Sequence, residues 1–158
     1  MSFLRFLMLL SLAAWLGGIF YFALVVAPAA FSVLPTRNLA GLLVTRSLTA
    51  LHGVGLVAGL TFLAASLTYF YFTTGSSHAL ALRHVLVVVM LALTLSAQFM
   101  VMPRMAALRA EMVEIDRVPE DDARRIEFNR LHRWSTTLES GVFLLGLGVL
   151  ASLARRMG

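Results

Sequence analysis

The sequence predicts an all-α integral membrane protein: a four-helix up-down bundle in which the helices of spans three and four extend into a long polar loop. Apolar residues make up 59% of the chain and charged residues 13%, roughly half the charged share of soluble proteins. Four apolar segments are each long enough to cross the hydrocarbon core of a bilayer. The first two connections between them are short, as in up-down bundles. We therefore expect a single four-span domain over residues 1–158.

The first span is predicted over residues 3–27, and Pro28 lies where this helix should end. Trp15 falls near the middle of the span, although tryptophan prefers the membrane interface. We interpret Trp15 as packing against a neighbouring helix rather than contacting a ligand. Residues 29–47 are then expected to form the first loop, with a short interfacial piece over 39–44.

The second span is predicted over 48–72 and the third over 82–102. Gly55 and Gly59 form a G-x-x-x-G pair in the second span, which lets another helix approach closely. In a four-span protein we expect that helix to belong to the same chain. Pro103 is expected to close the third span.

The only long polar segment joins spans three and four, and we expect an extramembrane helical hairpin over about 104–135. Its first helix is indicated by apolar residues at helical spacing, namely Met102, Met105, Leu108, Met112 and Ile115. Pro119 breaks this helix, and the acidic residues 120–122 suit the N-terminus of the next one. That next helix is expected to continue into the fourth span, over 138–154.

The charge pattern bears on partners and on membrane topology. The net charge is +5 and every basic residue is arginine, and most arginines lie beside apolar segments, as topology-setting charges do. This pattern indicates a lipid bilayer as the partner and not nucleic acid. Loops one and three carry nine of the arginines, so we expect them to be cytoplasmic in a plasma or inner membrane. The chain has no cysteine, which excludes disulfides and thiolate metal sites.

Polar residues from three spans are expected at the end of the bundle that carries loops one and three, called here the loop-one/loop-three end. The candidate ligand-binding or polar-network residues are Arg46, His52, Gln98, Arg104, His132, Ser135 and Glu139. A rise of about 1.5 Å per residue places His52, Gln98 and Glu139 at a similar depth, a few turns inside the membrane. Ionisable groups at such depth are candidates for function. We also expect His132 to point inward and to contact Arg46, His52, Arg104 or Glu139.

Several interpretations of these polar residues remain open. They could form a structural network that fixes the register of the bundle, or a polar pocket for a small ligand or ion. A metal site would favour copper, with His52, His132 and the thioether of Met100 or Met102 as ligands, and haem between histidines is a further alternative. His78 and His84 lie towards the opposite side and are interpreted as interfacial. No nucleophile–base pair or phosphate-binding loop is visible, so we expect a non-enzymatic protein.

Short motifs along the chain resemble those of the transmembrane protein 205-like family, a domain of unknown function. They are Trp15-Leu-Gly, Pro28-x-x-Phe31, Ala40-Gly41, Ala97-x-Phe99-x-x-x-Pro103-Arg104 and Phe128-x-Arg130-x-His132-x-x-Ser135. The resemblance spans nearly the whole chain and implies four spans with a long loop between the third and fourth. More distantly, the layout is similar to copper-resistance-D-type domains and to four-helix membrane proteins of haem pathways.

Three functional hypotheses follow from these observations. The first is a non-enzymatic membrane protein whose polar pocket at the loop-one/loop-three end binds a small ligand or ion. The second is a structural or accessory subunit that packs against another membrane protein or a second copy of the chain. The third is a copper- or haem-handling membrane protein.

Overall fold

The computed structural model describes residues 2–74, 81–112 and 115–154. Their helical elements are, in chain order, α1 (Ser2–Tyr21), the π-helical turn η1 (Phe22–Val26), α2 (Ala27–Val33), α3 (Arg37–Thr74), α4 (Leu82–Ser96), the π-helical turn η2 (Ala97–Val101), α5 (Met102–Met112), the 3₁₀ turn η3 (Ile115–Arg117) and α6 (Ala123–Ala154). Elements α1, η1 and α2 are continuous, as are α4, η2 and α5. The helices therefore line up as four long rods.

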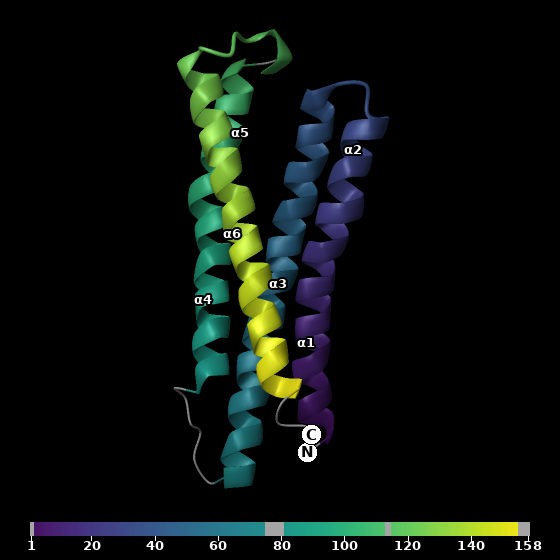
Figure 1. Ribbon diagram of the computed structural model, residues 1–158, viewed down its shortest axis with the longest axis vertical. Helices are drawn as coiled ribbons and strands as arrows, with labels where there is room; N and C mark the ends of the chain where they lie inside the picture. The colour runs from purple at the N-terminus through teal and green to yellow at the C-terminus, as the bar shows by residue number, and fades with distance from the viewer. Residues whose placement is uncertain (1, 75–80, 113–114, 155–158) are drawn as a thin grey trace.

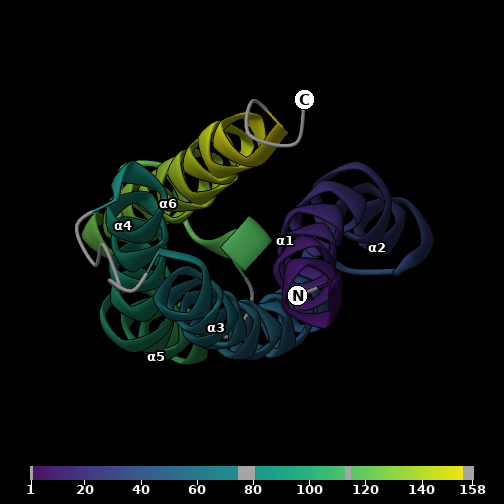
Figure 2. The same cartoon turned by 90° about the horizontal axis from the view of Figure 1, so that it is seen from below.

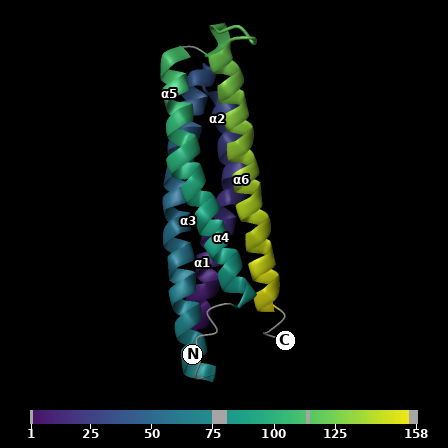
Figure 3. The same cartoon turned by 90° about the vertical axis from the view of Figure 1, so that its left-hand side faces the viewer.

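The four rods run roughly parallel along the long axis of the molecule (Figures 1 and 3). Seen from one end, α3 lies between α1 and α4, and α6 packs on α4 and touches α1 (Figure 2). The start of α1 and the end of α6 lie at one end, and the α2–α3 and α5–α6 connections lie at the other (Figure 1). Each rod is long and apolar enough to cross a membrane. The predicted all-α, four-helix up-down membrane bundle is confirmed.

Both π-helical turns lie just before a proline. η1 ends at Val26, two residues before Pro28, and η2 ends at Val101, two residues before Pro103. Proline has no N–H for the preceding turn and its ring crowds the carbonyl four residues earlier, so a wider turn relieves the contact. The prediction that Pro28 ends the first helix is wrong, because the rod continues through α2.

The first connection is much shorter than the predicted loop over 29–47. The chain turns at residues 34–36, where Leu34 is extended (φ −80°, ψ 140°), as is favoured before a proline. The Thr36 hydroxyl then accepts the Leu39 N–H at 3.2 Å and caps α3. Pro35, rather than Pro28, is thus the residue that separates the first two rods, and α3 already begins at Arg37.

Trp15 is the centre of the contact between α1 and α3. Its side chain is buried (2% exposed) and lies against Gly55 and Gly59, so closely that a Cβ added at Gly59 would lie 2.7 Å from Trp15 Cζ3. The G-x-x-x-G pair therefore accommodates an indole from the same chain, and both predictions about these residues are confirmed.

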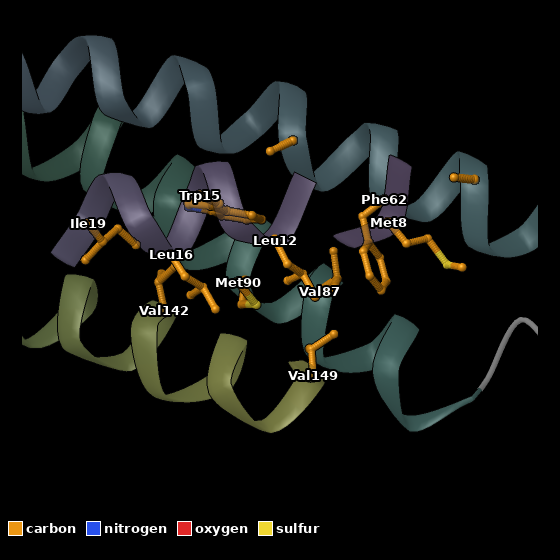
Figure 4. Packing of buried hydrophobic residues seen from close by; sticks show 12 residues of the cluster. Met8, Leu12, Trp15, Leu16, Ile19, Phe62, Val87, Met90, Val142 and Val149 are labelled. Atoms are coloured by element: carbon orange, nitrogen blue, oxygen red, sulfur yellow. The ribbon is translucent and has the colours of Figure 1, made fainter. Parts of the chain in front are cut away.

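An apolar core surrounds Trp15 and extends through all four rods (Figure 4). Its buried side chains include Met8, Leu12, Leu16, Ile19, Phe62, Val87, Met90, Val142 and Val149. Because lipid tails are as apolar as these side chains, close packing rather than removal from water stabilises such a core.

A second, smaller apolar cluster joins α5 to the start of α6. Leu108, Met112 and Phe128 are its buried members, and Met105 and Ile115 pack against them. At the start of α6, the Asp122 carboxylate accepts the backbone N–H of Arg124 at 2.8 Å. The predicted helix after Pro119 is confirmed, because α6 begins at Ala123 with Asp122 as its cap.

Candidate functional site

A buried histidine connects three of the four rods. His52 on α3 is 2% exposed. Its Nδ1 lies 2.7 Å from Oε1 of Gln98 on η2, and its Nε2 lies 2.5 Å from Oε1 of Glu139 on α6. His52 therefore contacts both of the side chains that were predicted to share its depth. We call this group the His52 cluster.

Local helix geometry positions the two partners of His52. Gln98 lies in the π-helical turn before Pro103, and π turns are frequent where a helix aims a side chain at a functional site. Glu139 lies between the buried residues Ser135 and Val142 on one face of α6. Its side chain keeps 16% of its surface exposed, so Glu139 is the more accessible end of the His52–Glu139 pair.

The hydrogen bonds of the cluster define where its protons lie. With Gln98 Oε1 as acceptor, His52 Nδ1 carries a hydrogen. The contact between Nε2 and Glu139 Oε1 then holds one further proton, which belongs either to a protonated carboxyl or to an imidazolium facing a carboxylate. Both arrangements are neutral overall, whereas loss of that proton leaves a negative charge in an apolar surrounding. The Nε2–Oε1 contact thus places one proton between two groups that can each carry it.

The predicted arginines lie outside the His52 cluster. Arg104 is exposed and pairs with Glu127, its Nε lying 3.0 Å from Oε1 of that residue. Arg46 is also exposed. Glu139 is therefore not the partner of either arginine and is bonded to His52 instead. Ser135 is buried on the same face of α6.

The prediction that His132 points inward is wrong. Its side chain is exposed, and no hydrogen bond or ion pair in the described ranges joins it to Arg46, His52, Arg104 or Glu139. His132 shares the helix face of Glu139, but it lies seven residues, or about two turns, nearer the start of α6. Because His132 is exposed while His52 is buried, the site is centred on His52 rather than on His132.

The proposed metal ligands are not gathered into one group. His132 is exposed, Met100 is exposed, and Met102 is buried, where it accepts the Thr49 hydroxyl at an Oγ1–Sδ distance of 3.9 Å. Both ring nitrogens of His52 are already engaged. Among the residues that the structure describes, no three His, Cys, Asp or Glu side chains are grouped so as to hold a metal ion.

A second buried polar group lies at the opposite end of the bundle. Arg83 and His84 are each 3% exposed, and Ser66 Oγ lies 2.8 Å from His84 Nε2 and 3.2 Å from Arg83 Nε. The Arg83 guanidinium also stacks over Phe70, 3.8 Å from the ring centre. His84, interpreted above as interfacial, lies in the first turn of α4 with its side chain buried against Ser66 of α3. His78 lies outside the described residues.

Four apolar rods and a buried ionisable cluster between them define the class of this protein as an α-helical integral membrane bundle. Comparison with protein families identifies the chain more closely. Residues 10–114 match the family described as Domain of unknown function (DUF4149), and the chain belongs to this family. The match includes His52 and Gln98 but ends before Glu139. No curated protein and no solved structure matches the chain.

Proposed function

We propose that this chain is a non-enzymatic membrane protein that binds a small ion at the His52 cluster, and that this ion is a proton. The observation that carries the proposal is a histidine, 2% exposed, whose two ring nitrogens are bonded to side chains from two other helices. Intramembrane ionisable groups that face one another between helices are typical of proton relays and ion pathways.

The accessibility of the cluster supports exchange of the proton. His52 is enclosed, whereas the side chain of Glu139 keeps 16% of its surface exposed. A proton would therefore enter and leave through Glu139 and be stored on the His52 side of the contact. Gln98 holds the ring in the tautomer that keeps Nε2 towards the carboxyl group.

A structural role is the competing reading of the same contacts. Hydrogen bonds from His52 to two other rods fix their register, as buried polar groups do in some helical bundles. In that case the protein is an accessory or scaffolding subunit, and the cluster does not exchange protons. A copper or haem role receives less support, because both His52 nitrogens are engaged and His132 lies outside the cluster.

We also propose the location and the wider relationship of the protein. The nine arginines of loops one and three favour a cytoplasmic position for the loop-one/loop-three end, in a plasma or inner membrane. The motif resemblance to the transmembrane protein 205-like family is compatible with the four rods and the long α5–α6 connection. It supplies no role for the His52 cluster.

The decisive experiment follows the protons of the cluster in protein reconstituted into lipid nanodiscs. The ring ¹⁵N resonances of His52 would be recorded from about pH 4 to about pH 9, in wild type and in Glu139→Gln. If the cluster exchanges protons, the His52 ring should titrate within this range in wild type. Its titration midpoint should then lie at a different pH in Glu139→Gln, because that variant lacks the carboxyl partner. A His52 ring that keeps one protonation state across this range in both proteins would establish the structural role instead.

A further inference from the structure

The His52 cluster lies close to one end of the membrane-spanning part of the bundle. Counting about 20 residues from Leu82, where α4 begins, places the end of the hydrocarbon core near Met102. Met102 meets α3 at Thr49, whose Oγ1 lies 3.9 Å from the Met102 Sδ atom. His52 follows Thr49 by three residues, or about 5 Å along α3. The cluster is therefore about one helical turn from the headgroup zone at the loop-one/loop-three end.

The distance from the cluster to the opposite end of the bundle is much longer. The second buried polar group, formed by Ser66, Arg83 and His84, marks that end. Ser66 follows His52 by 14 residues on α3, and His84 precedes Gln98 by 14 residues on the α4 rod. At about 1.5 Å per residue, both counts correspond to about 21 Å.

The apolar core fills this longer stretch. On α3 the cluster is followed by Gly55 and Gly59, and the indole of Trp15 lies against both. On α6 and α4 the buried side chains next in line include Val142, which is 1% exposed, and Met90, which is 0% exposed. Further buried apolar side chains follow towards the second polar group, namely Leu12, Phe62, Val87 and Val149. Water and protons need polar partners, which such packing does not supply.

Two buried hydroxyls within this stretch do not bridge it. Ser11 on α1 donates its hydroxyl to the Leu7 carbonyl of the same helix at 2.7 Å. Thr94 on α4 is 2% exposed and lies one turn from Gln98. One hydroxyl reaches across about one turn, which is far less than the distance of about 21 Å to the second polar group.

The side of the cluster towards loops one and three is polar and partly exposed. Thr49 is exposed, and its hydroxyl donates to the carbonyl of the half-buried Thr45 at 3.0 Å. On α6, Ser135 lies one turn from Glu139 on the same face, and His132 one turn further is exposed. Glu139 itself keeps 16% of its side-chain surface exposed. Polar side chains therefore lead from the cluster to this end on both α3 and α6.

We propose that the His52 cluster exchanges its proton with the loop-one/loop-three end alone, so that the protein responds to the pH on that side of the membrane and does not conduct protons across it. This inference rests on the proposed binding of a proton at the cluster. The step moves one proton and no electron. A hydronium ion at that end supplies the proton to the Nε2–Oε1 contact, and water at the same end accepts it on release.

The ionisable groups around His52 are few in the described ranges. Glu139 on α6 faces the ring directly, whereas its other partner, Gln98 on η2, does not ionise. On α1 the ionisable side chains are Arg5 and Tyr21, near the two ends of that helix. On α3 the exposed Arg46 precedes His52 by six residues. Glu139 is therefore the group through which the pH at one end reaches the ring.

The test releases protons on one side of lipid vesicles that hold the full chain in one orientation. A membrane-impermeant caged proton is placed outside the vesicles or trapped inside them, at the midpoint pH of the His52 titration in nanodiscs. The infrared band of the Glu139 carboxyl, identified by subtracting the spectrum of Glu139→Gln, is followed after a light flash. Protons released at the loop-one/loop-three end should change the band at once. Protons released at the other end should change it only after they have leaked through the lipid, as a trapped pH dye reports.

A matched pair of variants tests the route. Thr49→Val removes a hydroxyl on the loop-one/loop-three side and should slow the response of the band about tenfold, as expected when a barrier rises by about one hydrogen bond. Thr94→Val makes the same change on the other side of the cluster and should respond like wild type. Equal slowing by both variants would overturn the route along α3.

The measurement on the wild type needs no variant that must fold, apart from the spectrum used for subtraction. Equally fast responses to protons from the two sides would overturn the one-sided access, and so would a proton leak faster than that of protein-free vesicles. Either result leaves proton binding at the cluster intact. A His52 ring that does not titrate in nanodiscs would instead refute the proposed function, and this inference with it.

Discussion

Nε2 of His52 and Oε1 of Glu139 lie 2.5 Å apart, across the space between α3 and α6. The two residues are 87 positions apart in the chain and belong to rods that are not sequence neighbours. Their contact makes the cluster sensitive to any change in how α6 sits against the rest of the bundle.

Replacing His52 with alanine should destabilise the bundle. The change leaves the Gln98 amide and the Glu139 carboxyl without their buried partner, which costs about 1–3 kcal/mol. Thermal unfolding in detergent would measure the loss. His132→Ala is the matched control, since its exposed side chain predicts a change within about 0.5 kcal/mol. Similar losses in the two variants would contradict the placement of the site at His52.

Gly55→Ala should destabilise the contact between α1 and α3. A Cβ at this position would run into the indole of Trp15, and overpacking of this kind costs about 1–3 kcal/mol. Gly53→Ala is the control, because Gly53 has nothing within 4 Å of the added Cβ and gains the same helix propensity. Thermal unfolding of both variants isolates the contact with Trp15. If Gly55→Ala proves as stable as Gly53→Ala, then Trp15 does not pack on the glycine pair.

The start of α6 should respond to acid at an unusually low pH. The Arg124 side chain and backbone N–H both bond the Asp122 carboxylate, and they lower its pKa from 3.8 to about 2. Because the folded pKa is the lower one, this stabilisation is present above the unfolded value and is lost as the pH falls through about 2. Carboxyl ¹³C NMR of Asp122 should therefore show a midpoint near pH 2.

Arg124→Ala should move that midpoint back towards the ordinary value for aspartate, since the first cause of the shift is removed. Arg130→Ala serves as the comparison, because Arg130 is exposed and makes no bond to Asp122. An Asp122 carboxyl that titrates alike in both variants would show that Arg124 does not hold it.

The orientation in the membrane can be tested at a single introduced thiol. The chain contains no cysteine, and the side chain of Glu120 is 91% exposed in the α5–α6 connection. A Glu120→Cys variant should react with a membrane-impermeant maleimide in inside-out vesicles but not in intact cells, because loops one and three are expected to be cytoplasmic. The wild type should remain unlabelled in both. Labelling of intact cells would reverse the proposed orientation.

The depth of the His52 cluster was predictable because it depends only on distance along each helix. His52, Gln98 and Glu139 lie six or seven residues from Arg46, Arg104 and His132, and the constant rise per residue places them level. The start of α6 after Pro119 was predictable for a similar reason, since a cap is a local interaction between neighbouring residues.

The first connection and the position of His132 were not predictable in this way. Pro28 and Pro35 have the same intrinsic preference to interrupt a helix, and only the π-helical turn η1 lets the chain pass through the first of them. His132 and Glu139 lie on one face of α6, so no pattern in the sequence separates the exposed residue from the partly buried one.

By itself the sequence determined the membrane class, the four rods and the levels of their polar residues, because hydropathy and helical rise are properties of each segment alone. Tertiary structure decided which of the residues at the same depth contact one another. Glu139 of α6 reaches His52 of α3, whereas His132, two turns earlier on the same face of α6, is exposed. Arg109 likewise meets Gly41 and Thr45 only because α5 packs against α3. Contacts of this kind depend on the angles between helices, which arise from packing among all four rods.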